Sequence, residues 1–131
     1  MTQSRNDLKQ RYDAMKFLMI LNDPPYGTER VYNGLRLATN LLAKNDDAEV
    51  SLFLLGDSAS AAKSKQQTPN GYYNVERMLV SAMRKGATVR VRGTCMDAPG
   101  LTDTELVEGA ARSTLDELTE MTVNADKVLV F

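Results

Sequence analysis

The chain of 131 residues contains no histidine, and this absence excludes several kinds of site. A Ser-His-Asp triad, a Cys-His pair and any metal site with a histidine ligand each need a residue that the chain lacks. Cys95 is the only cysteine, so the chain cannot form an internal disulfide, a CxxC motif or an all-cysteine metal site. A single thiol without disulfides is typical of the reducing cytoplasm, where we expect the protein to be located.

Long apolar runs and excess charge are also absent. No segment approaches the ~18–20 consecutive apolar residues that cross a bilayer. The chain has 16 Lys and Arg residues against 17 Asp and Glu residues, a net charge of −1 at pH 7. This balance disfavours a basic protein that binds nucleic acid or an anionic membrane. We therefore expect neither nucleic acid nor a membrane among the partners.

The first 14 residues differ from the rest. Residues 1–14 are polar and lack the apolar core of a signal peptide, and the globular pattern starts at Met15. We expect a flexible or loosely docked N-terminal extension; alternatively, Met15 is the true initiator. Residues 15–131 have the size and the ordinary globular composition of a single domain.

Strand and helix signals alternate along residues 15–131. The expected strands cover residues 17–21, 50–55, 87–91 and 127–131. The expected helices run from an N-cap at Thr28 to Lys44, over 58–65, from Val75 to just before Gly86, and along one face from Val107 to Met121. Buried strands that alternate with helices predict a three-layer α/β/α sandwich with a mainly parallel sheet of four to five strands, flavodoxin-like or related.

Ligands of such sheets collect at the carboxyl ends of the strands, where the expected loops are 22–27, 56–57 and 93–100. Cys95 lies in the third loop. Backbone N–H groups there, with Arg90 and Arg92 just upstream, favour a thiolate, whereas Asp97 opposes it. A lone cysteine is also often a small buried hydrophobe. Both interpretations remain open on these features alone.

Five segments in register resemble the YchN-type branch of the DsrE/DsrF-like family. They are Asn-Asp-Pro-Pro-Tyr-Gly-Thr-Glu (22–29), Phe-Leu-Leu-Gly-Asp (53–57), Gly-Tyr-Tyr-Asn-Val (71–75), Gly-Thr-Cys-Met-Asp-Ala (93–98) and Ala-Asp-Lys-Val-Leu (125–129). The resemblance implies one DsrE-like α/β domain over 15–131 and a homo-oligomer, commonly a trimer or hexamer. It also implies a sulfur-relay role, in which Cys95 accepts sulfane sulfur as a persulfide from a donor protein and an acceptor protein takes it up.

The chain departs from the family pattern at two positions. Arg92 stands where relatives often carry a second cysteine, so an intramolecular resolving thiol is missing. Pro99 stands where they often carry arginine, which removes a cation for anionic sulfur; Arg92 could supply that charge. Beside Cys95, the candidate binding residues are Asn22, Tyr26, Gly27, Thr28, Arg92, Gly93, Thr94 and Asp97.

Other polar groups near the strand ends have two interpretations each. The loop tyrosines could line a pocket, but we favour packing of the loops or an interface for Tyr26, Tyr72 and Tyr73. Asp23, Asp57 and Asp97 could converge on Mg²⁺, but such residues usually bond the local backbone in turns, so we expect no metal and no cofactor. Two functions remain: a sulfur carrier or sulfurtransferase-type protein that uses Cys95, and a non-catalytic oligomeric module that binds a small ligand or supports assembly with Cys95 only packed.

Overall fold

A five-stranded parallel sheet forms the centre of the molecule. The computed structural model describes residues 15–131, and the expectation of a flexible extension over 1–14 lies outside the described residues. The strand order is β4-β3-β2-β1-β5, and every neighbouring pair is parallel. The strands are β1 (Lys16–Leu21), β2 (Glu49–Leu54), β3 (Thr88–Arg92), β4 (Ala110–Ser113) and β5 (Lys127–Val130). The parallel α/β class is confirmed, in a strand order related to but different from the 2-1-3-4-5 order of flavodoxin.

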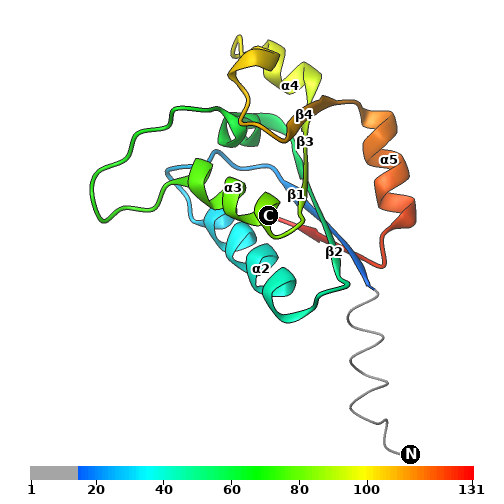
Figure 1. Ribbon diagram of the computed structural model, residues 1–131. Coiled ribbons are helices and arrows are strands. Elements are labelled where there is room, and N and C mark those ends of the chain that lie inside the picture. The colour runs from blue at the N-terminus through cyan, green and yellow to red at the C-terminus, as the bar shows by residue number, and fades with distance from the viewer. Residues whose placement is uncertain (1–14) are drawn as a thin grey trace, which may run out of the picture.

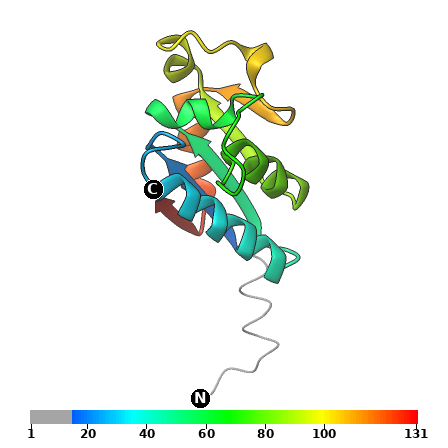
Figure 2. The ribbon, with the colours of Figure 1, turned by 90° about the vertical axis from the view of Figure 1, so that its left-hand side faces the viewer.

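Helices cover the sheet unequally on its two faces. Helices α2 (Arg30–Lys44) and α3 (Val75–Arg84) lie together on one face, and α5 (Leu115–Asn124) lies on the other (Figures 1 and 2). Three short helices lie near the carboxyl ends of the strands: η1 (Gly56–Ala62), α4 (Gly93–Asp97) and η2 (Asp103–Glu105). The expected three-layer sandwich is therefore present, with its third layer made by one helix.

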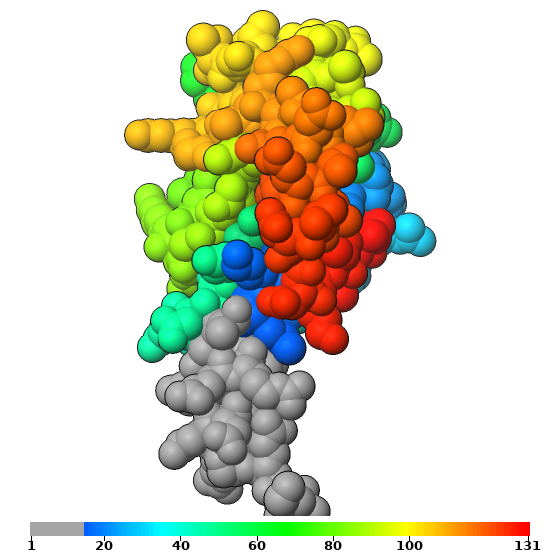
Figure 3. Space-filling view, turned by 90° about the vertical axis from the view of Figure 1, so that its right-hand side faces the viewer, coloured from blue at the N-terminus to red at the C-terminus, as the bar shows by residue number. Residues whose placement is uncertain are grey.

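The alternation of side chains along β1 explains the two cores. Met19 and Leu21 belong to the large cluster beneath α2 and α3, whereas Leu18 joins Phe53 and Leu118 in a smaller cluster beneath α5. Figure 3 looks onto this second face, where α5 runs over the sheet with β5 beside it. Since both faces of β1 are covered, its sequence reads as a continuous apolar run.

Helix α2 begins one residue later than predicted. Its buried side chains recur at helical spacing and include Val31, Leu35 and Ala38. The N-cap is Glu29 rather than Thr28, because the Thr28 hydroxyl donates to Asp23 Oδ2 at 3.2 Å instead of capping the helix. The prediction of Thr28 as the N-cap was wrong.

Two further elements differ from the sequence-based expectation. Residues 93–97 form helix α4 where a loop was expected, and residues 110–113 form strand β4 where one face of a long helix was expected. Gly109 has a φ of +99°, which interrupts a helix at that point. The side chain of Thr114 then accepts a hydrogen bond from the Glu117 N–H, so α5 starts only after Thr114.

Candidate functional site

A cavity of about 550 Å³ opens at the carboxyl ends of β1, β2 and β3. It is lined by Pro24, Gly56, Asp57, Ala59, Ser60, Thr94, Cys95, Ala98 and Pro99. These residues come from the segments that follow each of the three strands. The sheet therefore brings together the three loops that the strand pattern placed at its carboxyl edge.

Cys95 is the third residue of α4 and is half-buried in the wall of this cavity. The next residue, Met96, is fully buried in the large core. Because Met96 fixes the helix to the core, the neighbouring thiol is presented at a defined edge of the cavity. Small side chains such as Ala59, Ser60 and Ala98 leave room around it.

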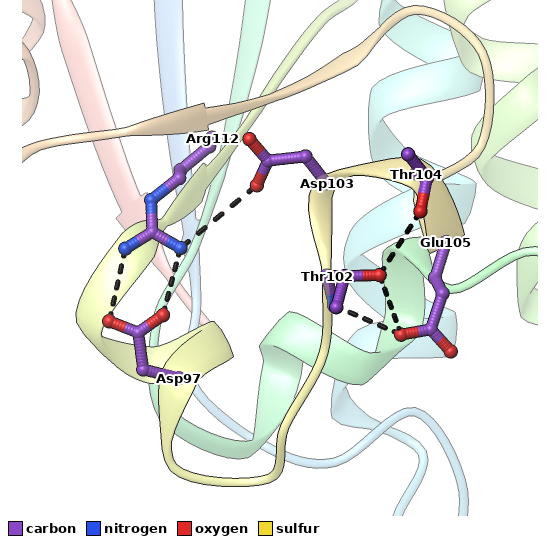
Figure 4. Close-up of polar contacts among 6 residues, drawn as sticks. All are labelled: Asp97, Thr102, Asp103, Thr104, Glu105 and Arg112. Carbon is purple, nitrogen blue, oxygen red and sulfur yellow. Dashed lines mark hydrogen bonds and ion pairs between the residues drawn. The ribbon is translucent and has the colours of Figure 1, made fainter.

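A bidentate ion pair holds the end of α4 against β4. Arg112 Nη1 and Nη2 donate to the two carboxylate oxygens of Asp97 at 2.9 and 3.0 Å, and Asp103 lies 4.0 Å from Nη1 (Figure 4). The hydrogen bonds from Arg112 hold the pKa of Asp97 below its usual range. Gly93 permits this arrangement, since a β-carbon there would lie 2.6 Å from Arg112 Nε.

The chain beyond α4 is fixed by a capping box. The backbone N–H and the hydroxyl of Thr102 both donate to Glu105 Oε1, at 3.0 and 2.9 Å (Figure 4). The backbone hydrogen bond lowers the pKa of Glu105, and the hydroxyl hydrogen bond adds to this effect. The Ser64 N–H also donates to the Glu105 carbonyl, which ties this segment to the chain that follows η1. The cavity wall around Cys95 is thus braced on the side of α4 and on the side of η1.

Comparison with known proteins identifies the family and agrees with the fold. A family model described as the DsrE/DsrF-like family matches residues 15–131. The chain belongs to the DsrE/DsrF-like family. It is 39% identical to the uncharacterized protein MJ0989 of Methanocaldococcus jannaschii over 117 residues, which are 89% of this chain and 100% of that protein. The resemblance to the YchN-type branch is also confirmed, since the protein YchN of Escherichia coli is 35% identical over 116 residues, covering 88% of this chain and 98% of that protein.

Solved structures show the same fold. The crystal structure of the E. coli YchN protein matches this DsrE/DsrF-like chain with a TM-score of 0.83 and 35% identity, and covers 89% of this chain and 99% of that one. The structure of MTH1491 from Methanobacterium thermoautotrophicum, a protein of unknown function, matches with a TM-score of 0.70 at 12% identity, covering 88% and 97% of the two chains. The latter match concerns the fold alone.

Of the candidate residues in this DsrE/DsrF-like protein, Thr94 and Cys95 line the cavity. Gly93 lies beneath the Arg112 guanidinium and Asp97 is paired with it. Arg92 follows Val91, which is buried in the large core, so alternation directs the Arg92 side chain to the α5 face of the sheet. Among the described residues, no Lys or Arg lines the cavity, and Asp57 is its charged member.

The candidates in the first loop lie elsewhere. The Asn22 side chain donates to the carbonyl of Phe131 at 3.5 Å, and Gly27 and Thr28 are exposed outside the cavity lining. Tyr26 belongs to a tyrosine cluster between the first loop and the segment before α3: its hydroxyl accepts from the Val75 N–H at 2.9 Å, and its ring stacks on Tyr73.

The sequence does not indicate Arg112 as a site residue, because the pattern around it predicts a helix whereas the structure has strand β4. The signal that would have found it is Thr-x-x-Glu at residues 114–117, which marks the start of a helix just before the buried Leu118.

Residues 15–131 contain neither a cluster of metal ligands nor a membrane-spanning helix. No group of three or more Cys, Asp or Glu side chains there could hold a metal ion. Asp23 contacts Thr28 and Arg30, and Asp97 contacts Arg112, so the three strand-end aspartates do not converge. Within the same range, none of the helices has the length and apolar character of a membrane span.

Proposed function

We propose that this protein is a sulfur carrier that accepts sulfane sulfur as a persulfide on Cys95 and passes it to a partner. The observation that supports this most is the position of the only cysteine, half-buried in the wall of an open cavity at the carboxyl ends of three parallel strands. Membership of the DsrE/DsrF-like family, which is associated with sulfur relay, supports the same chemistry.

Two displacement steps at sulfur would complete the relay. The Cys95 thiolate attacks the outer sulfur of a donor persulfide; a Cys95 Sγ–S bond forms, the donor S–S bond breaks, and the donor leaves as a thiolate. A thiolate of the acceptor protein then attacks the outer sulfur held by Cys95, and Cys95 leaves as a thiolate. Each step exchanges one S–S bond for another, so no external oxidant or reductant is needed.

The cavity suits the intermediate of these steps. A persulfide extends Cys95 by one sulfur atom, and the small lining residues Ala59, Ser60 and Ala98 leave space for it. Asp97 is held by Arg112, so its carboxylate is neutralised by a cation rather than directed unpaired toward the added sulfur. The open mouth of the cavity leaves the outer sulfur within reach of a donor or acceptor protein.

The test compares the folded protein with the same chain unfolded in urea. Both are treated with glutathione persulfide at one pH, and the gain of one sulfur atom at Cys95 is followed by mass spectrometry. We expect the folded protein to take up sulfur at least ~10-fold faster, and to transfer it to an acceptor thiol, because the cavity presents an oriented thiol. Cys95→Ser should take up none while its fold is retained.

The opposite result would favour a binding or assembly module. Equal or slower uptake by the folded protein would mean that the cavity does nothing for Cys95, and the carrier proposal would fail. In that case Cys95→Ser should lower the melting temperature, since a hydroxyl without a partner would replace a packed thiol at a cost of roughly 1–3 kcal/mol.

The proposal includes a closed homo-oligomer, a trimer or hexamer, in the cytoplasm. Val128 and Val130 are 40% and 65% exposed on β5, the strand at one edge of the sheet. An edge strand with exposed apolar side chains is a ready surface for pairing, which supports assembly. Light scattering of the purified protein should give a multiple of the chain mass; a value near the 14.5 kDa of one chain would refute the oligomer.

A further inference from the structure

A second hollow, separate from the Cys95 cavity, lies between α2 and α3. Its volume is about 420 Å³, and its walls include Tyr32, Arg36, Tyr72, Tyr73, Arg77 and Met78. We refer to these six residues as the tyrosine groove. Small-molecule sites commonly occupy ~300–1,000 Å³, so the groove has the volume of a small ligand. It shares no lining residue with the Cys95 cavity.

Stacked aromatic rings form one wall of the groove. The Tyr73 ring lies 4.5 Å from that of Tyr72 and 4.6 Å from that of Tyr32, centroid to centroid. Behind it, the Tyr26 ring stacks on Tyr73 at 5.8 Å. Tyr72 is the outermost member and is 50% exposed, so part of its ring surface remains uncovered. An uncovered ring beside stacked rings is a platform for a planar group.

The two charged side chains in the lining of the groove, Arg36 and Arg77, are both basic. Arg36 donates to the Tyr32 hydroxyl at 3.0 Å, and its guanidinium lies 5.8 Å from the centre of that ring, which holds the cation at the rim. Arg77 forms no ion pair and no side-chain hydrogen bond among residues 15–131. No Asp or Glu from the described residues lines the groove. Two guanidinium groups without an acidic neighbour in the lining are complementary to an anion.

The platform is fixed before any ligand arrives. The Tyr26 hydroxyl accepts from the Val75 N–H at 2.9 Å, and the Tyr73 hydroxyl donates to the Thr28 carbonyl at 3.4 Å. These bonds connect the loop after β1 with the start of α3. A rigid platform reduces the ordering cost of binding.

We propose that the tyrosine groove binds a small planar anion, an aromatic or heteroaromatic ring that carries a phosphate or carboxylate group. The ring stacks on the uncovered surface of Tyr72, and the anionic group is bound by Arg36 and Arg77. This site is independent of sulfur transfer at Cys95.

Calorimetric titration of the full chain tests this proposal with adenosine monophosphate and benzoate as separate probes. At least one should bind saturably with a Kd of about 1 mM or tighter. Inorganic phosphate and acetate lack the ring, so they lose the binding free energy of stacking on an aromatic side chain. They should bind at least ~10-fold more weakly than the probe with the same anionic group. The stronger probe shows which combination of ring and anionic group the groove prefers.

Matched variants on one helix locate the site. Arg77→Gln should weaken binding ~10-fold or more through loss of a charge-assisted hydrogen bond. Arg84→Gln removes the same charge from another exposed position of α3, outside the groove, and should change Kd less than about twofold. Tyr72→Leu should weaken binding, whereas Tyr72→Phe, which keeps the ring, should not. Circular dichroism should show that all four variants are folded.

Three outcomes would overturn the proposal. The first is no saturable binding of either probe. The second is an equal loss in Arg77→Gln and Arg84→Gln, which would indicate attraction to the whole charged surface. The third is that Arg77→Gln and Tyr72→Leu change the oligomeric mass while no probe binds, which would assign the groove to an interface between copies of this chain.

Discussion

Gly93→Ala should displace Arg112 and release the end of α4. A β-carbon at this position would lie 2.6 Å from Arg112 Nε and 2.7 Å from Cζ, whereas ordinary contact begins at 3.4 Å. The guanidinium must therefore move by about 0.8 Å, the difference between the contact limit and the shorter distance. The bonds to Asp97 measure 2.9 and 3.0 Å, so a shift of this size lengthens at least one of them beyond the ~3.2 Å limit of a good hydrogen bond.

The cost to the fold should be small even though the ion pair is lost. Overpacking of a rigid core costs about 1–3 kcal/mol, but the obstacle to alanine here is the end of a flexible, half-exposed side chain. We expect the free energy of unfolding to fall by no more than about 1 kcal/mol, a decrease of roughly 4 °C in melting temperature. The effect on Cys95 should be larger, since α4 then loses the ion pair that ties its end to β4 and the thiol becomes more accessible.

The assay is the rate at which iodoacetamide alkylates Cys95 at fixed pH, together with thermal melting. Gly93→Ala should raise the rate in the wild-type background and have no such effect in an Arg112→Ala background, where the clashing atoms are absent. If Gly93→Ala acts equally in both backgrounds, alanine alters the backbone of α4 directly and the reasoning about Arg112 is wrong. An unchanged rate in the wild-type background would refute it as well.

Three further predictions follow from polar groups elsewhere in the fold. Arg112 lowers the pKa of Asp97, so the ion pair stabilises the fold fully above the ordinary carboxyl pKa of 3.8. This stabilisation is lost as the pH falls through the lower pKa of the folded state. The difference in melting temperature between wild type and Asp97→Asn should therefore be constant above about pH 5 and vanish in acid. The hydrogen bond with Tyr72 raises the pKa of Tyr73 from 10.0 to about 12. The neutral form of Tyr73 therefore stabilises the fold fully below pH 10, and this contribution is lost as the pH rises through 12. In Tyr72→Phe, alkaline absorbance titration should show Tyr73 ionising at lower pH, and an unchanged titration would contradict the assigned cause. Ser58 is fully buried, and its hydroxyl has no hydrogen-bond partner among residues 15–131. Ser58→Ala should therefore raise the free energy of unfolding by about 1 kcal/mol. A lower melting temperature of this variant would show that the hydroxyl is hydrogen-bonded.

Buried strands were predictable because both faces of each strand are covered. The runs at 17–21 and 50–55 contain few polar residues, and the structure places strands at Lys16–Leu21 and Glu49–Leu54. Residues 110–113 carry no such signal: β4 has four residues, lies at a sheet edge and includes the exposed Arg112. Its apolar residues also fit the period of a helix, so the sequence alone is compatible with a strand or with a longer helix. Only the N-cap at Thr114, where α5 begins, distinguishes these two structures.

The cavity was predictable in position but not in composition. Parallel strands direct the loops after β1, β2 and β3 to one edge, which is why Thr94, Cys95 and Asp57 were expected there. The Asp97–Arg112 pair joins positions 15 residues apart through the β3–β4 pairing, which a single sequence does not specify. The tyrosine cluster has a similar origin, since the Tyr26 hydroxyl reaches Val75 across 49 positions.

The place of β5 in the sheet has a consequence for synthesis. β5 pairs with β1, the first of the five strands along the sequence, and the Lys16 N–H donates to the Asp126 carboxylate across 110 positions. β1, β2, β3 and β4 can pair in the order in which they emerge from the ribosome, but one side of β1 stays open until the final strand arrives. Loop closure over such a distance is slow compared with pairing of neighbours. A nascent chain that stalls before β5 therefore exposes an apolar strand edge, and that edge is where we expect chaperones to bind the unfinished protein.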